Sequence, residues 1–402
     1  MIDTIDVHMA AGLLPEETTV GTLSFRHVRG REYQEFVYAP TWLRNGFSID
    51  PALPLIAGSF RSTGESFGCF SDASPDRWGR ALIRRSVRQK SVSHHKNLFE
   101  SEYLLKVSDS YRLGALRFYL GSTPLAPDTH GVPPLQHIVA FEATIRKIQE
   151  GVTVAEKEFQ DILSPGSSLG GARPKMSIVD TDGVLWLAKF SNISDAYDVP
   201  AREAISLEIA RQCHLNVPDF RLMKISEERH ALLVKRFDRN AKGRIPFMSS
   251  MTLLQAIDGQ SDEYAYLDIA EAIQKISREN AASDLKELWR RMVVNICIAN
   301  RDDHLRNHGF LWNGKCWCLS PVYDLEISPE KSGHALALND SGDVTPDLDI
   351  PVEVAPYYGI PKDDATAFIT FVKGIASEWL HIGKSLSIFE KQLRQMPDME
   401  FG

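Results

Sequence analysis

The chain contains 402 residues, of which 43% are hydrophobic and 24% charged, as in an ordinary globular protein with about two or three domains. The formal net charge of −8 excludes a generic nucleic-acid-binding protein, because such proteins are basic. Five scattered cysteines and an N-terminus without a basic, apolar leader predict free thiols and a cytoplasmic location. The lack of any run of about 18 apolar residues predicts that no segment spans a membrane.

The first 100 residues predict a hairpin followed by a basic helix. Two β-rich runs, TVGTLSF and EFVYAP, flank the polar run HVRGREYQ. A helix is expected over residues 75–96, with Ser74 as its N-cap and Pro75 in its first position. From Arg77 to Lys96 the charged residues of this helix are all basic: Arg77, Arg80, Arg84, Arg85, Arg88, Lys90 and Lys96. This helix contacts DNA phosphates or an acidic partner, or else it presents a solvated face or pairs within the chain with the surplus acids.

A glycine-rich stretch lies in the middle of the chain. The Pro- and Gly-rich run TPLAPDTHGVPPL predicts a linker, and QHIVAFEATIRKIQEG after it has the apolar spacing of a helix. In LSPGSSLGGARPKMSIV, Gly166, Gly170 and Gly171 allow close approach to a phosphate, and Arg173 or Lys175 would add charge. The run matches neither standard nucleotide-binding fingerprint, so a flexible hairpin loop is the alternative.

A lysine and a glutamate follow at kinase-like positions. The apolar run GVLWLAKFS predicts a strand with Lys189 near its end. Burying an ammonium is costly unless a partner is present, and kinases supply nucleotide phosphates and a helix carboxylate. The next helix, PAREAISLEIARQCHL, offers Glu203 and Glu208 for that role. The alternative is an edge-strand lysine that faces solvent.

Two further strands, DFRLMKI and ALLVKRFDR, precede a mostly helical part. The second strand ends near Phe237, where a kinase chain passes between its lobes beside the adenine ring. The run SDLKELWRRMVVNICIAN has apolar residues on one helical face and leads the chain to Asp302.

Asp302 lies five residues before Asn307, and Asp324 follows a predicted hairpin with an NGK turn. Protein kinases use this order of residues to position the attacking hydroxyl and to hold Mg2+ against the nucleotide phosphates. An Asp-rich turn is the alternative. Cys316 and Cys318 share one side of the hairpin, which is a weak signal for a metal site.

Taken in order, these parts resemble the HipA-type serine/threonine kinase toxins of bacterial toxin–antitoxin pairs. The resemblance rests on SSLGGARPK, LAKF, LNVPDFRLM, LLVKRFDR, NRDDHLRNHGF and SPVYDLEIS, and more loosely on SPDRWGRALIRR. It implies an α+β, protein-kinase-like two-lobed fold with a β-rich N-terminal part and a mostly helical C-terminal lobe. The implied domains are a HipA-like N-terminal subdomain (1–125), the part of the kinase N-lobe with the Gly-rich loop (126–237) and the helical C-terminal lobe (238–402).

The resemblance also implies roles for single residues. Asp302 is the catalytic residue, and the five-residue step to Asn307 selects it over the adjacent Asp303. Asn307 and Asp324 are the Mg2+ ligands. The residues implied in ATP binding, besides these two ligands, are Gly170, Gly171, Ala172, Lys175, Lys189, Glu203, Lys235 and Phe237. Ser168 is the loop serine that the family autophosphorylates, with Ser167 as its rival.

The implied activity is transfer of the ATP γ-phosphate to a protein Ser or Thr, on a target in translation such as an aminoacyl-tRNA synthetase. The implied partner is a small helix-turn-helix antitoxin similar to HipB, through which the complex would contact DNA. Two alternatives stay open. One is a small-molecule kinase of related fold, and the other is a non-catalytic partner of a DNA-bound repressor that uses the 75–96 helix.

Overall fold

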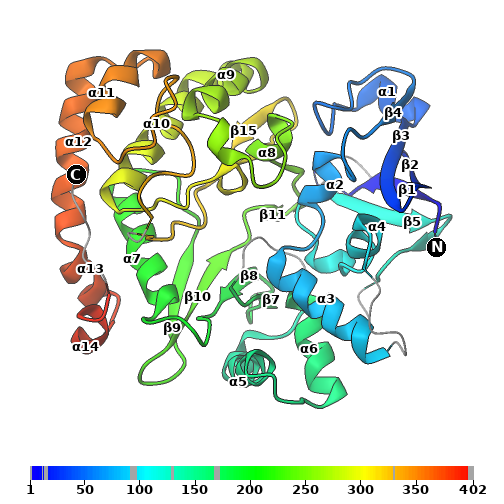
Figure 1. The fold of residues 1–402 in the computed structure, drawn as a ribbon, viewed down its shortest axis with the longest axis horizontal. Helices are drawn as coiled ribbons and strands as arrows, with labels where there is room; N and C mark the ends of the chain where they lie inside the picture. The colour runs from blue at the N-terminus through cyan, green and yellow to red at the C-terminus, as the bar shows by residue number, and fades with distance from the viewer. Residues whose placement is uncertain are drawn as a thin grey trace. The chain divides into compact units, whose positions relative to one another are not determined.

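The computed structural model describes residues 2–10, 12, 17–90, 97–127, 131–166, 173–328 and 331–396. The chain forms two compact units, one from Met1–Ile193 with Asp238–Met248 and the other from Ser194–Phe237 with Ser249–Gly402. Most strands belong to the first half of the chain and most helices to the second, as the colours of Figure 1 show. The expected combination of a β-rich N-terminal part and a helical C-terminal part is confirmed. The three domains drawn from the sequence, with boundaries after residues 125 and 237, stay predictions.

The first unit contains a six-stranded sheet, several short helices and two hairpins. The sheet has the order β4-β3-β2-β1-β5-β6. Its strands are β1 (Thr4–Met9), β2 (Thr18–Val28), β3 (Arg31–Tyr38), β4 (Ser59–Arg61), β5 (Leu116–Leu120) and β6 (Thr123–Pro124). The hairpins are formed by β7 (Lys175–Val179) with β8 (Leu185–Lys189), and by β11 (Arg239–Asn240) with β12 (Gly243–Arg244). The helices are α1 (Pro40–Asn45), α2 (Gly68–Asp72), α3 (Arg77–Lys90), α4 (Glu100–Leu104), η1 (Asp109–Tyr111), η2 (Leu135–His137), α5 (Ile138–Gln149) and α6 (Glu156–Gly166).

The hairpin predicted near the N-terminus is confirmed. Strands β2 and β3 pair antiparallel from Gly21 with Tyr38 to Val28 with Arg31. The two residues between them, Arg29 and Gly30, have φ angles of 50° and 79°, as two-residue hairpin turns require. The apolar side chains of this sheet pack with those of α1 and α2 into a continuous core. The sequence did not predict β1, which occupies a central place in the sheet.

The second unit is mainly helical. Its helices are α7 (Val199–Gln212), α8 (Ser250–Leu253), η3 (Ser261–Glu263), α9 (Tyr266–Ile276), η4 (Arg278–Asn280), α10 (Ala281–Cys297), η5 (Leu305–Asn307), α11 (Asp349–Val354), η6 (Ala355–Tyr358), α12 (Lys362–Ser377), α13 (Trp379–Ser385) and α14 (Glu390–Leu393). Its strands pair as two antiparallel hairpins, β9 (Phe220–Lys224) with β10 (His230–Lys235) and β14 (Gly309–Trp312) with β15 (Trp317–Leu319). A short strand, β13 (Phe247–Ser249), lies where the chain returns to this unit.

Helix α10 forms the core of the second unit and carries the chain to the predicted catalytic loop. It packs against α9 and α12. Leu288 and Met292 are completely buried, and the buried Trp289 donates its indole N–H to the Pro351 carbonyl at 2.8 Å. Each fully buried apolar side chain of this size contributes about 1.5–3 kcal/mol relative to an exposed one. The end of α10 is therefore a rigid base for residues 298–308.

Helix α3 begins at Arg77, two residues later than predicted. Asp76, and not Ser74, caps it, because the Gly79 N–H donates to Asp76 Oδ1 at 2.6 Å. Ser74 instead donates its hydroxyl to the Phe70 carbonyl at 2.9 Å. A carboxylate suits this position better than a hydroxyl, since it also interacts favourably with the helix dipole. Residues 91–96 of the predicted helix lie outside the described residues.

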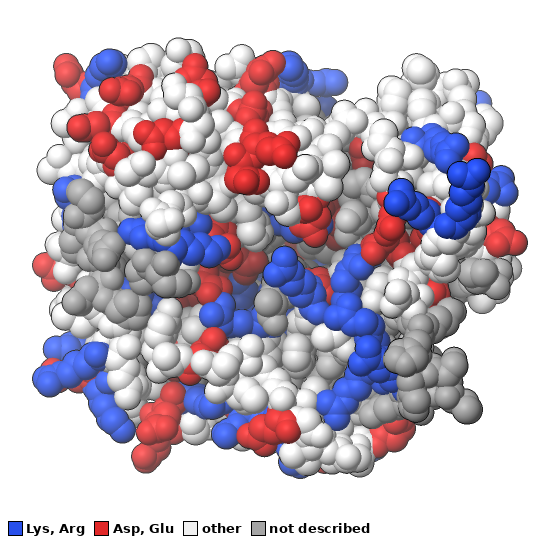
Figure 2. Space-filling model, viewed as in Figure 1, with Lys and Arg blue, Asp and Glu red and all other residues white. Residues whose placement is uncertain are grey.

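The arginines of α3 divide into two groups. Arg80 makes two 2.6 Å bonds to the carboxylate of Glu100, and Arg85 donates to the carbonyl oxygens of Ile148 and Val152 near the end of α5. The other described arginines of the helix are exposed: Arg77, Arg84 and Arg88. Figure 2 shows Lys and Arg side chains, in blue, over the region of α3. Intramolecular pairing with an acid is thus confirmed for Arg80, whereas Arg85 bonds backbone carbonyls instead. Contact with a partner stays a prediction.

Candidate active site

Two adjacent carboxylates at the end of α10 have opposite environments. The side chain of Asp302 is 41% exposed, whereas that of Asp303 is 3% exposed. The backbone of this loop turns sharply, since Ala299 has a φ of 54°. Asp302 therefore presents its carboxylate to solvent, and Asp303 directs its carboxylate into the second unit.

Asp303 is bound by three side chains. Asn295 Nδ2 donates to Asp303 Oδ2 at 2.7 Å, His308 Nε2 lies 3.0 Å from Asp303 Oδ1, and the Tyr266 hydroxyl donates to Asp303 Oδ2. Asn295 also contacts the Tyr266 oxygen at 3.0 Å and accepts from the Asn300 amide at 3.0 Å. A buried carboxylate is tolerated when its oxygens are bonded in this way. This cluster joins α9, α10 and the residues on both sides of Asp302.

The predicted metal ligands Asn307 and Asp324 are connected through their neighbours. Asn307 donates its amide N–H to the Asp302 carbonyl at 3.0 Å, so its amide oxygen is the atom suited to a cation. The Tyr323 hydroxyl donates to the Arg306 carbonyl at 2.7 Å, which ties the residue before Asp324 to the residue before Asn307. The structure thus brings the segments of Asp302, Asn307 and Asp324 together.

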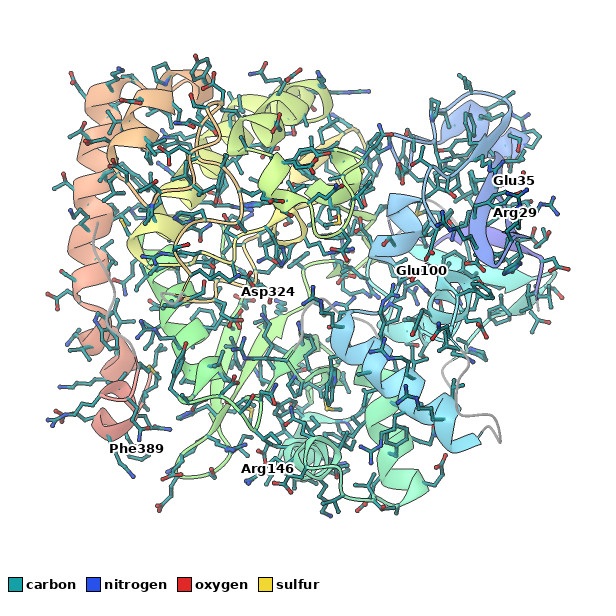
Figure 3. All side chains as sticks on the ribbon, viewed as in Figure 1. Arg29, Glu35, Glu100, Arg146, Asp324 and Phe389 are labelled. Atoms are coloured by element: carbon teal, nitrogen blue, oxygen red, sulfur yellow. The ribbon has the colours of Figure 1, made fainter. Side chains whose placement is uncertain are left out.

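Asp324, labelled in Figure 3, has a φ of 53°. Such a left-handed backbone is uncommon for a residue other than glycine and is frequent at functional sites. Phe237, which the sequence places beside adenine, packs its ring against Tyr323 with 5.5 Å between ring centroids. Lys235 is half-exposed and pairs with Asp219 at 2.8 Å, so its side chain already has a surface partner.

The two candidate glutamates of helix α7 differ in their exposure. Glu203 is buried, whereas Glu208 lies on the surface and bonds Arg211 at 3.0 Å and Gln212 at 3.2 Å. The start of the helix is fixed by a buried pair that the sequence did not suggest: His230 Nδ1 of β10 lies 2.6 Å from Asp198 Oδ2. Of the two glutamates, Glu203 is therefore the one whose environment suits a role inside the protein.

The first unit holds the two predicted nucleotide lysines on one hairpin. Lys175 begins β7, Lys189 ends β8, and the two residues are direct cross-strand partners. Both are buried, at 5% and 8% exposure, and residues directly opposite in a strand pair extend to the same face. The Lys175 ammonium lies 3.8 Å from the carboxylate of Asp76, the cap of α3. Two ammonium groups on one face suit an anionic ligand, which is the role that the sequence predicts for them. The sequence does not single out Asp76, because Ser74 two residues earlier is also a capping residue.

The remaining site residues of the prediction are Ser167, Ser168, Gly170, Gly171 and Ala172. They lie outside the described residues. Their roles stay predictions.

The cysteine pair gains no support as a metal site. The Sγ atoms of Cys316 and Cys318 lie 3.8 Å apart, but within the described ranges no group of three or more His, Cys, Asp or Glu side chains is placed to hold a metal. Burial raises the pKa of the Cys318 thiol to about 12, which disfavours the thiolate that a metal would need. All five cysteines are free.

His334, which packs near the catalytic loop, makes folding sensitive to acid. Burial lowers its pKa to about 4, with nearby Asp303 opposing and Arg301 adding to the effect. In the unfolded chain a histidine has a pKa of about 6.5, so the unfolded state binds the proton first as pH falls. We expect the free energy of unfolding to drop by about 3 kcal/mol between pH 6.5 and 4 from this residue alone. Urea denaturation at several pH values should show a flatter profile for His334→Met, and equal slopes would contradict the assignment.

Across the part of the chain that the structure describes, none of the helices combines the length and the hydrophobicity needed to cross a bilayer.

Comparison with known families gives two matches along the chain. Residues 167–379, just over half of the sequence, match the HipA-like C-terminal domain, and residues 13–118 match the HipA N-terminal domain. Among solved structures, the Shewanella oneidensis MR-1 toxin–antitoxin complex of HipA, HipB and operator DNA is similar, with a TM-score of 0.66 and 17% identity. This likeness covers 98% of the present chain and 92% of that chain, and it shows a shared fold.

Two curated relatives are named as kinases. "Putative kinase Y4dM" of Sinorhizobium fredii (strain NBRC 101917 / NGR234) is 27% identical over 252 residues, which is 53% of this chain and 59% of the relative. "Putative kinase" of Haemophilus influenzae (strain ATCC 51907 / DSM 11121 / KW20 / Rd) is 25% identical over 203 residues, which is 45% of this chain and 57% of the relative. The chain thus matches less than two thirds of the length of either relative.

Proposed function

The chain belongs to the HipA family, and from that premise we propose that it is a serine/threonine protein kinase that uses ATP and Mg2+. The observation that carries the proposal is the contrast between Asp302 and Asp303. A loop that is merely structural needs a buried, bonded carboxylate such as Asp303. It does not need an exposed carboxylate beside it, five residues before an asparagine that bonds back to the Asp302 carbonyl.

In the proposed reaction, the bond between the γ-phosphorus and its bridging oxygen breaks while a bond forms from the acceptor hydroxyl oxygen to that phosphorus. ADP leaves with the electron pair of the broken bond, and the hydroxyl proton passes to the Asp302 carboxylate. Asp303 does not touch the reactants. It holds the loop so that Asp302 stays in position.

Several residues of the chain have a proposed role in binding the nucleotide and its metal ion. Mg2+, when bound, neutralises charge on the β- and γ-phosphates. Asn307 and Asp324 would hold it, since both supply the oxygen ligands that this cation prefers. Lys175 and Lys189 would attract the phosphates, and Phe237 would pack against the adenine. Gly170, Gly171 and Ala172 would line the phosphate loop, on the strength of the sequence.

The proposed target is a protein of translation, such as an aminoacyl-tRNA synthetase, and the proposed regulator is a small helix-turn-helix antitoxin. The similar Shewanella structure contains HipA, HipB and operator DNA, which supports a HipB-like partner here. Through that partner the complex would contact DNA. Phosphorylation of Ser168 or Ser167 would add about two negative charges a few residues before Lys175 in the sequence and so weaken ATP binding.

Transfer of labelled γ-phosphate from ATP with Mg2+ tests the proposal. We expect label on the protein itself and on a protein band of a bacterial lysate, with phosphoserine or phosphothreonine after hydrolysis. Ser168→Ala and Ser167→Ala, made singly and together, should identify the modified loop serine by loss of self-labelling. A protein that binds ATP but labels nothing would overturn the kinase assignment and favour a non-catalytic partner of a repressor.

A further inference from the structure

Lys331 contacts the proposed catalytic residue directly. Its ammonium nitrogen donates to Asp302 Oδ1. Both side chains are partly open to solvent, at 43% and 41% exposure. The two residues are 29 positions apart, and Lys331 belongs to none of the motifs that the sequence singled out.

The backbone of Lys331 is anchored to the residue before Asp302. The Arg301 guanidinium donates to the Lys331 carbonyl, and the Lys331 N–H donates to the Ser328 carbonyl at 3.2 Å. Ser328 is itself attached to the loop, because its hydroxyl accepts from the Arg301 N–H at 2.9 Å and its N–H donates to the Ala299 carbonyl at 2.9 Å. The ammonium therefore reaches Asp302 from a fixed base.

A chance surface ion pair is the competing interpretation. Exposed pairs of lysine and carboxylate are weak, because water screens them and the long side chain loses freedom. Chance pairing does not account for the anchoring of the Lys331 backbone by Arg301 and Ser328. The weakness of the pair is also what a working site needs, since the ammonium must leave Asp302 easily when an acceptor hydroxyl arrives.

On the basis of the proposed kinase activity, we propose that Lys331 is a further catalytic residue of phosphoryl transfer. Before substrate binds, it holds the Asp302 carboxylate. When the acceptor hydroxyl displaces the ammonium from Asp302, the ammonium moves to the oxygens of the γ-phosphoryl group that is being transferred. It stays protonated throughout, while the acceptor proton goes to Asp302 and ADP leaves with the electron pair of the broken bond. A lysine supplies a compact charge with three donors for such oxygens.

The test compares Lys331→Met with Lys331→Arg in the full-length protein. We expect Lys331→Met to lower kcat for self-labelling or lysate labelling roughly 100-fold, as loss of one preorganised donor does. Lys331→Met should keep values close to those of the intact protein for the KM for ATP, for the affinity for ATP measured by calorimetry and for the thermal midpoint. Lys331→Arg should restore most of the rate, because it keeps the charge.

Lys315→Met is the matched control, since Lys315 lies exposed in the turn between β14 and β15. The substitution removes the same charge from the same unit. It should leave kcat unchanged. An unchanged or increased kcat for Lys331→Met, with Asp302→Asn inactive, would overturn the role of Lys331 and leave the kinase assignment intact. Absence of transfer by the intact protein would overturn both.

Discussion

Asp302→Asn should reduce phosphate transfer by about 10²–10⁴-fold, the contribution typical of a positioned general acid–base group. The substitution keeps the size of the side chain but removes the carboxylate that receives the hydroxyl proton. Stability should not change measurably, because Asp302 is 41% exposed and its pair with Lys331 is a surface contact. Initial rates with labelled ATP, alongside a thermal unfolding scan of the same preparation, provide the measurement.

A measurement of ATP affinity distinguishes the loss of phosphate transfer in Asp302→Asn from a defect in nucleotide binding. Asp302→Asn should bind ATP with near-normal affinity, since Asp302 acts on the acceptor. Lys189→Met should bind ATP more weakly, because it removes one of the two buried ammonium groups of the β7–β8 hairpin. An Asp302→Asn protein that transfers phosphate at the intact rate would remove this residue from the mechanism.

Asp303→Ala should destabilise the second unit by about 2–6 kcal/mol, because each buried donor left without an acceptor costs about 1–3 kcal/mol. The substitution removes the oxygen that accepts from the Tyr266 hydroxyl and the Asn295 amide, and it removes the oxygen that lies 3.0 Å from His308 Nε2. For a unit of this size each kcal/mol lowers Tm by about 2–4 °C, so the transition of that unit should fall by roughly 10 °C. Calorimetry of the intact and substituted proteins gives the shift.

The adjacent Asp302→Asn protein is the control for Asp303→Ala, since the two positions differ in burial and not in residue type. Asp302→Asn should abolish transfer and leave Tm unchanged, whereas Asp303→Ala should lower Tm. If the two proteins unfolded at the same temperature, the buried cluster would not stabilise the loop as argued here.

Much of the local structure follows from the sequence. The β2–β3 hairpin, the helices α5, α7 and α10, and the strands β8, β9 and β10 were all predicted, because apolar spacing and turn residues are local signals. Helix starts were less certain. Both Ser74 and Asp76 have capping side chains, and only the observed bond from the Gly79 N–H distinguishes them.

For the site, residue types, their order and the resemblance to a family identify the candidates Asp302, Asn307, Asp324, Lys175 and Lys189. The tertiary structure is needed to show which carboxylate is open and which is buried, since Asp302 and Asp303 are identical in type and adjacent. The structure also shows that Lys175 and Lys189 are cross-strand partners and that Lys331 contacts Asp302. Such contacts join residues 14 to 37 positions apart. They depend on how elements pack, which local patterns of residues along the chain do not show.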